Sequence, residues 1–196
     1  ITRAVPYDRP NTTMATFAFC PDCEREYHDP SDRRFHAQPN ACSKCGPQIE
    51  FRPKGAERGV KGESALEQCI AMLAQGGTVA IKGLGGFHIA CDALNDRAVW
   101  MLRERKRKSN KPFALMTSSL DVIGRYCEVS PDAQVLLLSP KRPIVMLKKK
   151  AQQAGLSENV SPNNQFIGWM LPYTPLHHLL FLPADGKAER ISALVM

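Results

Sequence analysis

Residues 78–91 read TVAIKGLGGFHIAC, and this stretch decides the fold of the larger part of the chain. Thr78–Lys82 is rich in β-branched residues, which is typical of a strand. Gly83, Gly85 and Gly86 follow it and form a turn, because clustered glycines interrupt regular structure. From His88 to Leu94 the chain is largely apolar again. The stretch therefore predicts a strand, a glycine-rich turn and a second apolar segment.

Helical and strand-like patterns alternate on both sides of this stretch. Before it, apolar residues recur at helical spacing from Ala65 to Leu73, and Gly76-Gly77 ends that helix. After it, residues 151–165 are a polar loop. Three more helices are expected: from Asn95 or Asp96 to about Arg107, from Ser130-Pro131, and over Leu176–Leu182. Three more strands are expected over Pro112–Met116, Ile144–Leu147 and Ile191–Met196. This alternation predicts an α/β domain over residues 63–196.

The first third of the chain has a different character. Residues 1–16 are polar and rich in turn formers, so an extended lead-in is expected there. Residues 17–50 contain two cysteine pairs and few aliphatic side chains, too few for a stable core. A bound metal would supply the missing stability. The sequence predicts a finger segment over residues 1–51 and a glycine-containing, charged linker over residues 52–62.

The cysteine pairs have the spacing Cys20-x2-Cys23-x18-Cys42-x2-Cys45. Two such pairs bring four thiolates to one tetrahedral zinc ion, and the interval suits zinc ribbons and related sites. Four protein ligands close the coordination shell, so the zinc would be structural. Redox-active or disulfide-bonded cysteines are the alternative reading. His28 and His36 lie between the pairs, and either is an alternative ligand.

The bulk composition points to a reducing compartment. The seven cysteines cannot all pair within the chain, and Cys69, Cys91 and Cys127 stand singly in apolar segments, as small buried side chains do. The chain has no apolar run of transmembrane length and no signal peptide at its start. We expect a piece of a cytoplasmic protein.

The formal net charge of +7 favours nucleic acid or a polyanionic nucleotide as partner.

Three segments carry the expected binding chemistry. The glycine turn is either an anion site built from backbone N–H groups or an ordinary turn. Residues 103–112, which include Lys106, Lys108 and Lys111, are a triphosphate clamp, a solvated basic face or a nucleic-acid contact. Residues 168–178 contain Pro172, Tyr173 and Thr174, and form either a rigid pocket wall or a capped helix start. No motif for a covalent nucleophile is present, so no catalytic side chain is assigned.

These segments, in this order, resemble the HypF family of hydrogenase maturation carbamoyltransferases. Cys20–Cys45, with its inner DPSDRRFH at residues 29–36, is similar to the second of that family's two four-cysteine fingers. Pro6–Pro10 resembles the piece that follows the first finger. Residues from about Gly62 onward resemble most of the family's YrdC-like domain, and this resemblance implies a twisted mixed sheet with helices.

The resemblance also implies a function. The family is expected to form carbamoyl adenylate from carbamoyl phosphate and ATP, with Mg²⁺ as the ion that accompanies the nucleotide. It then passes the carbamoyl group to the partner HypE, where it becomes the cyanide ligand of [NiFe]-hydrogenase. The YrdC-like domain is expected to perform the adenylation, and the zinc ion is expected to be structural.

The family's nucleotide and carbamate site carries over residue by residue. The resemblance assigns to it Lys82, Gly83, Gly85, Gly86, Phe87, His88, Lys106, Lys108, Lys111, Pro112, Pro172, Tyr173 and Thr174. At Lys108 the family motif has arginine, so the bidentate fork is absent while the charge remains. A family Ser-x-Asn motif would follow Met196, and the expectation is weak nucleotide binding without it. The alternative function is a YrdC-like RNA-binding module of the kind used in tRNA threonylcarbamoyladenosine synthesis.

Overall fold

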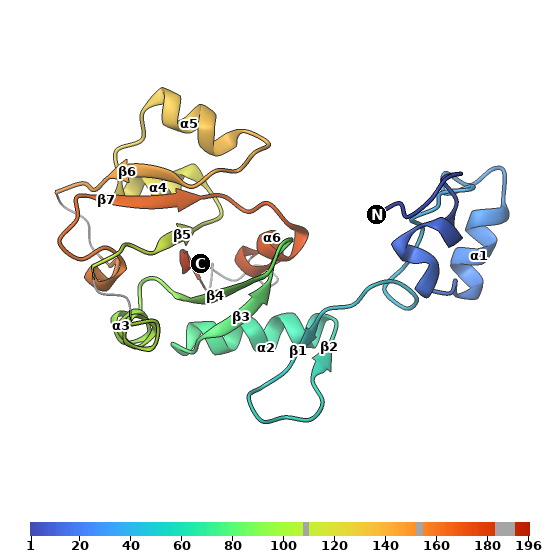
Figure 1. The fold of residues 1–196 in the computed structure, drawn as a ribbon, viewed down its shortest axis with the longest axis horizontal. Coiled ribbons are helices and arrows are strands. Elements are labelled where there is room, and N and C mark those ends of the chain that lie inside the picture. Colours follow the sequence, from blue (N-terminus) through green and yellow to red (C-terminus); the bar gives the residue numbers. More distant parts are fainter. Residues whose placement is uncertain (108–109, 152–154, 183–190) are drawn as a thin grey trace. The chain divides into compact units, whose positions relative to one another are not determined.

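The computed structural model describes residues 1–107, 110–151, 155–182 and 191–196. The chain divides into two compact units, Ile1–Ala65 and Leu66–Met196, each with its own internal packing (Figure 1). The finer division into a finger over residues 1–51 and a linker over residues 52–62 stays a prediction. Among the described residues, no helix is both long enough and apolar enough to cross a membrane.

The smaller unit contains short elements only. Its single α-helix begins at Pro21, a favourable first position, and has acidic residues in its first turn and basic residues in its last, which suits the helix dipole. A two-stranded antiparallel hairpin follows, and its loop occupies the segment predicted as a linker. The elements are η1 (Arg9–Asn11), η2 (Thr13–Thr16), α1 (Pro21–His28), β1 (Glu50–Phe51) and β2 (Val60–Lys61).

A buried arginine organises the smaller unit. The expectation of an extended lead-in over residues 1–16 is wrong for residues 9–16. The Arg9 guanidinium donates to the carbonyl oxygens of Gln38 at 2.8 Å, Asn40 at 2.8 Å and Phe17 at 2.7 Å. It also lies 3.9 Å from the centroid of the Phe19 ring. Residues 9–16 therefore fold into two 3₁₀ turns that hold Arg9 against the rest of the unit. A local composition rich in turn formers does not reveal such a long-range contact.

The larger unit is built on a mixed six-stranded sheet with the order β3-β4-β8-β5-β7-β6. All neighbouring pairs are antiparallel except β5 and β7, which are parallel. The predicted α/β class with a mixed sheet is confirmed, and the glycine turn joins β3 to β4. The strands are β3 (Val79–Lys82), β4 (Phe87–Asp92), β5 (Ala114–Met116), β6 (Val145–Lys148), β7 (Phe166–Met170) and β8 (Leu194–Val195).

Side-chain caps define where several helices of this unit begin. Asn95 accepts from the N–H of Ala98 at 2.9 Å, and Ser130 accepts from that of Ala133 at 3.2 Å, as the sequence predicts. The helix after Asn95 ends at Arg105, two residues earlier than expected. The helices are α2 (Glu63–Ala74), α3 (Asp96–Arg105), α4 (Leu120–Tyr126), α5 (Pro131–Leu138), α6 (Pro175–Phe181) and the 3₁₀ turn η3 (Glu158–Val160).

The sequence patterns did not reveal β7 and α4. The strand β7 contains Gly168, and a Cβ atom at that position would lie 2.7 Å from the Ile144 Cγ2 atom. The side chain of Ile144 therefore packs directly on the backbone of Gly168. Glycine is a poor strand former, and here this close approach requires it. The pairing with β5 and β6, rather than local propensity, makes this segment a strand.

The core of the larger unit lies between the sheet and its helices. Trp169 is fully buried, stacks on Tyr126 at 5.9 Å between ring centroids, and donates its indole N–H to the Cys127 Sγ atom at 3.1 Å. Cys69 and Cys91 are also buried, which confirms the prediction that the three single cysteines are small core residues.

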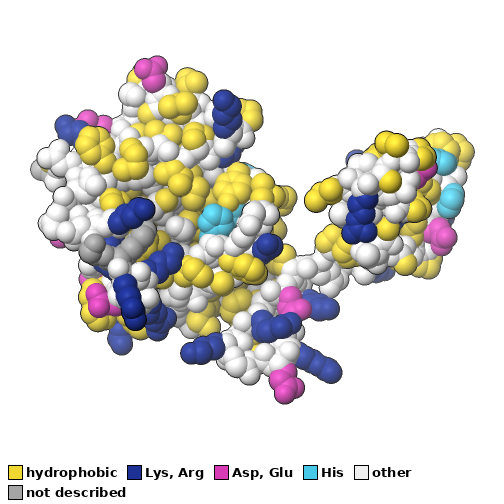
Figure 2. Space-filling view, viewed as in Figure 1, with side chains coloured by type: hydrophobic (Ala, Val, Ile, Leu, Met, Phe, Trp, Pro, Cys, Tyr) yellow, Lys and Arg dark blue, Asp and Glu magenta, His cyan; other side chains and the backbone are white. Residues whose placement is uncertain are grey.

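The outer face of α5 instead exposes Val135, Leu136 and Leu138. Figure 2 shows hydrophobic side chains over this part of the surface.

A second buried arginine ties three segments of this unit together. Arg103 of α3 donates to the carbonyl oxygens of Asn159 at 2.5 and 2.9 Å, of Val160 at 3.1 Å and of Lys111 at 3.1 Å. Its guanidinium also lies 4.6 Å from the centroid of the Phe113 ring. The side chain is only 6% exposed, so these carbonyl groups have little access to water as an alternative partner.

We predict that Arg103→Lys lowers the free energy of unfolding by about 2–4 kcal/mol, because an ammonium group cannot reach all of these carbonyl groups and leaves some of them buried and unpaired. Urea denaturation of the chain measures this change. Arg105→Lys, at an exposed position of the same helix, is the matched control and should change stability by less than about 0.5 kcal/mol. Equal effects of the two substitutions would contradict the stabilising role of the Arg103 hydrogen bonds.

Candidate functional site

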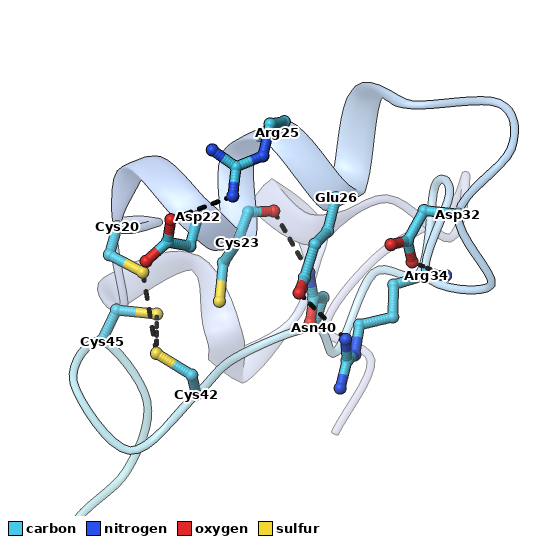
Figure 3. Close-up of polar contacts among 10 residues, drawn as sticks. All are labelled: Cys20, Asp22, Cys23, Arg25, Glu26, Asp32, Arg34, Asn40, Cys42 and Cys45. Atoms are coloured by element: carbon cyan, nitrogen blue, oxygen red, sulfur yellow. Dashed lines mark hydrogen bonds and ion pairs between the residues drawn. The ribbon is translucent and has the colours of Figure 1, made fainter.

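The four paired cysteines converge on one point (Figure 3). Cys20 immediately precedes α1 and Cys23 lies in its first turn, while Cys42 and Cys45 flank a tight turn closed by the Gly46 N–H and the Cys42 carbonyl at 2.8 Å. All four Sγ atoms lie within 4.8 Å of one another, and neighbouring ones are 3.6 and 3.8 Å apart. A tetrahedron with Zn–S bonds of about 2.3 Å requires S···S distances of about 3.8 Å. The geometry fits a zinc ion.

The electrostatics of the cluster also fit a cation. Backbone hydrogen bonds from Cys42 and Cys20 lower the pKa of Cys45 to about 6. Backbone hydrogen bonds from Cys45 and Lys44 lower the pKa of Cys42. Burial raises the pKa of Cys23 to about 12, and hydrogen bonds with the other thiols add to this effect. A divalent cation would offset that penalty, because thiolate is the form that binds zinc.

The alternatives for this cluster find no support among the described residues. All seven cysteines are free thiols, so no disulfide competes with the metal reading. The His28 and His36 rings each lie 5.2 Å from the ring of Tyr27, between centroids, and neither imidazole belongs to the group of potential ligands. The Asn40 side-chain amide donates to the Cys23 carbonyl at 3.2 Å and so holds α1 against the second pair.

The glycine turn is a tight connection between β3 and β4. The Gly83 N–H donates to the Gly86 carbonyl at 2.7 Å. A Cβ atom on Gly83 would lie 2.8 Å from the His88 Nε2 atom, so glycine is needed for close approach at this position. Gly85 and Gly86 face open space. Lys82 and Phe87 are opposite each other in the ladder, with the Lys82 Nζ atom 5.2 Å from the Phe87 ring centroid.

His88 connects this turn to the predicted pocket wall. Its Nε2 atom and the Tyr173 Oη atom are 2.7 Å apart and share a hydrogen bond. The Tyr173 ring is in edge contact with the His177 ring at 4.5 Å between centroids. Thr174 caps α6 by accepting from the His177 N–H at 3.2 Å, and both Pro172 and Thr174 are buried. The structure therefore brings the glycine turn and residues 172–174 together, as the predicted site requires.

Two of the predicted lysines, Lys106 and Lys111, lie at and shortly after the end of α3. Lys106 is the residue that ends the helix, and its Nζ atom lies 6.0 Å from the Phe113 ring centroid. Burial and the charge of Asp92 raise the pKa of Cys91 to about 12, and the charge of Lys106 acts in the opposite direction. Lys106 therefore interacts electrostatically with β4. Lys111 is exposed, and Pro112 is half-buried next to it. Lys108 lies outside the described residues. Figure 2 shows lysine and arginine side chains gathered over the region of α3.

Three residues that the sequence did not assign lie beside the predicted pocket wall. His177 is fully buried and, in the described structure, both of its ring nitrogens lack a hydrogen-bond partner. Arg142 and His178 line a surface pocket together with Pro172–Pro175. The adjacent His177-His178 pair is visible in the sequence and could have indicated these two residues. Arg142 lies 30 residues before Pro172 along the chain, and only the tertiary fold brings the two together.

Comparison with known proteins agrees with this organisation. The Sua5/YciO/YrdC family model, described as "Telomere recombination", matches residues 71–188, and the model described as "HypF finger" matches residues 19–51. The carbamoyltransferase HypF of Rhodobacter capsulatus is 51% identical over 180 residues, which cover 92% of this chain and 23% of that protein. The chain thus spans about a quarter of the length of such relatives.

Two solved structures of HypF proteins are also similar. HypF from T. kodakarensis has a TM-score of 0.81 and 39% sequence identity, covering 99% of this chain and 25% of that one. A full-length HypF in a phosphate- and nucleotide-bound form has a TM-score of 0.75 and 42% identity, covering 100% of this chain and 24% of that one. The finger geometry, the mixed sheet and these relatives agree: the chain belongs to the Sua5/YciO/YrdC family, carries a HypF-type finger before that domain, and is a homologue of the HypF carbamoyltransferases.

Proposed function

We propose that the chain is the finger and adenylating part of a carbamoyltransferase. This enzyme forms carbamoyl adenylate from carbamoyl phosphate and ATP and passes the carbamoyl group to a HypE-type acceptor protein, for the cyanide ligand of [NiFe]-hydrogenase. The observation that carries the proposal is the 51% identity to a named carbamoyltransferase over 92% of the chain. The finger and the Sua5/YciO/YrdC domain match residues 19–51 and 71–188 of this chain.

The adenylation step needs positioning and charge neutralisation more than covalent catalysis. Hydrolysis of carbamoyl phosphate first breaks its carbamoyl–phosphate bond and gives carbamate and inorganic phosphate. A carboxylate oxygen of carbamate then attacks the α-phosphorus of ATP, the bond to the β-phosphate oxygen breaks, and pyrophosphate leaves. Lys106, Lys111 and Lys108 are assigned to the phosphates, because cations stabilise the charge that develops on the leaving group. Mg²⁺ accompanies ATP as its co-substrate ion. Lys82 and the N–H groups of the glycine turn are assigned to the same nucleotide site.

The zinc ion has a structural role in this proposal. Cys20, Cys23, Cys42 and Cys45 would hold it and fill its coordination shell, so no position remains for a substrate. The ion would link α1 to the turn at residues 42–45 in a unit whose buried hydrophobic residues are few. A cytoplasmic location is part of the proposal, since free thiols and zinc sites of this kind persist in a reducing compartment.

We predict that the purified chain contains one zinc ion and that Cys45→Ser abolishes its retention, because three ligands leave the shell open. Elemental analysis after dialysis measures the stoichiometry. Cys69→Ser is the matched control, since Cys69 lies in α2 outside the cluster, and it should retain the metal. Full zinc content in the Cys45→Ser protein would contradict the assignment.

We predict that Lys106→Ala slows carbamoyl phosphate-dependent ATP–pyrophosphate exchange by roughly 10–100-fold in the full-length protein, because a charged contact to phosphate contributes about 1.5–3 kcal/mol. The exchange of labelled pyrophosphate into ATP measures this rate. Arg97→Ala, at an exposed position near the start of the same helix, is the control and should leave the rate unchanged.

Two outcomes would count against the proposed function. Unchanged exchange in the Lys106→Ala protein would remove the phosphate-clamp role. RNA binding that weakens steeply with salt, together with no effect of ATP, would favour the alternative YrdC-like RNA-binding function.

A further inference from the structure

A surface pocket of about 370 Å³ lies between two segments that are far apart in sequence. One wall is the loop after α5, with Pro140 and Arg142, and the other is Pro172–Pro175 with His178. Three of the lining residues are prolines, whose fixed φ angles make the walls stiff. The pocket is therefore an open surface hollow with stiff walls and a small number of polar groups.

Arg142 supplies a guanidinium group to this pocket, and the last turn of α5 holds that group in place. Its Nη1 atom donates to the Leu137 carbonyl at 3.1 Å. Its backbone has a φ of 44°, a left-handed conformation that is costly for arginine and is common at functional sites. Among the described residues, its Nε and Nη2 atoms make no hydrogen bond, and none of the ion pairs includes it. This guanidinium keeps donors for a planar oxyanion.

The facing wall contains no carboxylate and can form hydrogen bonds. Tyr173 shares a hydrogen bond with His88, and a phenol oxygen that makes one such bond retains capacity for another. Beneath it, His177 is fully buried, and burial, followed by the charges of His88 and His178, lowers its pKa to about 4. The imidazole of His177 is therefore uncharged at neutral pH. No carboxylate lines the pocket, so none competes for Arg142.

We propose that this pocket binds a small planar carboxylate-type anion, with Arg142 as its ionic anchor and the Tyr173 hydroxyl as the group that contacts its other end. The inference rests on the proposed function, which makes carbamate the natural ligand. Carbamate matches both walls: its carboxylate suits the guanidinium fork, and its amino group can donate to the Tyr173 oxygen. Arg142 thereby joins the substrate site as a residue that selects the acyl group rather than the nucleotide.

The direct test uses [¹³C]bicarbonate, a stable planar analogue of carbamate, and inorganic phosphate as probes. Both are titrated by NMR against the full-length protein and its Arg142→Gln and Arg142→Lys variants. We expect bicarbonate affinity to fall at least fivefold in both variants while phosphate affinity is unchanged. Lys141→Gln, an exposed neighbour that does not line the pocket, should bind bicarbonate as the unmodified protein does. Loss of phosphate affinity alone, or no bicarbonate binding to the unmodified protein, would overturn the proposal.

A kinetic arm separates this inference from the proposed function. In carbamoyl phosphate-dependent exchange, Arg142→Lys and Tyr173→Phe should raise the KM for carbamoyl phosphate at least fivefold and leave the ATP dissociation constant unchanged. Equal weakening of ATP binding would overturn the assignment to the acyl group. Absence of any exchange in the unmodified protein, together with Arg142-dependent bicarbonate binding, would reject the proposed function and support the pocket. Thermal melting of each variant identifies loss of folding, and Tyr173→Phe retains the ring packing against His177.

Discussion

The buried guanidinium of Arg103 is the interaction on which the larger unit depends. It joins α3 to the carbonyl groups of Lys111, Asn159 and Val160, and so holds the start of β5 and the turn η3 on one helix. Lys106 ends that helix, and Lys111 lies on one of the segments that Arg103 binds. The Arg103 hydrogen bonds therefore also fix the backbone positions of these two lysines. A buried charge needs several good acceptors to offset its desolvation, and backbone carbonyl groups supply such acceptors here.

The smaller unit applies the same principle with less apolar material. Arg9 gathers the carbonyl groups of Phe17, Gln38 and Asn40, and the four cysteine thiols meet within 4.8 Å of one another. Neither feature depends on a large hydrophobic core, which a segment of this size cannot build. The arginine determines the path of the chain, and a bound metal would hold the two cysteine pairs at their observed separation.

The proposed substrate site has two parts. Lys106 and Lys111 are assigned to the polyphosphate, whereas Tyr173 lines a pocket with Arg142 and packs against the buried His177. An adenylating enzyme needs both environments, because its nucleotide carries several charges and its acyl group carries one at most.

The features that rest on local spacing can be predicted from the amino-acid sequence alone. The cysteine intervals predicted the metal cluster, the glycines predicted the turn between β3 and β4, and Asn95 and Ser130 predicted two helix starts. The tertiary structure decided what depends on contacts between distant residues. The pairing of β7, the folding of residues 9–16 around Arg9, and the meeting of Arg142 with Tyr173 have no local signature. The physical reason is that periodicity reports which face of an element is apolar, but not which other segment will cover it.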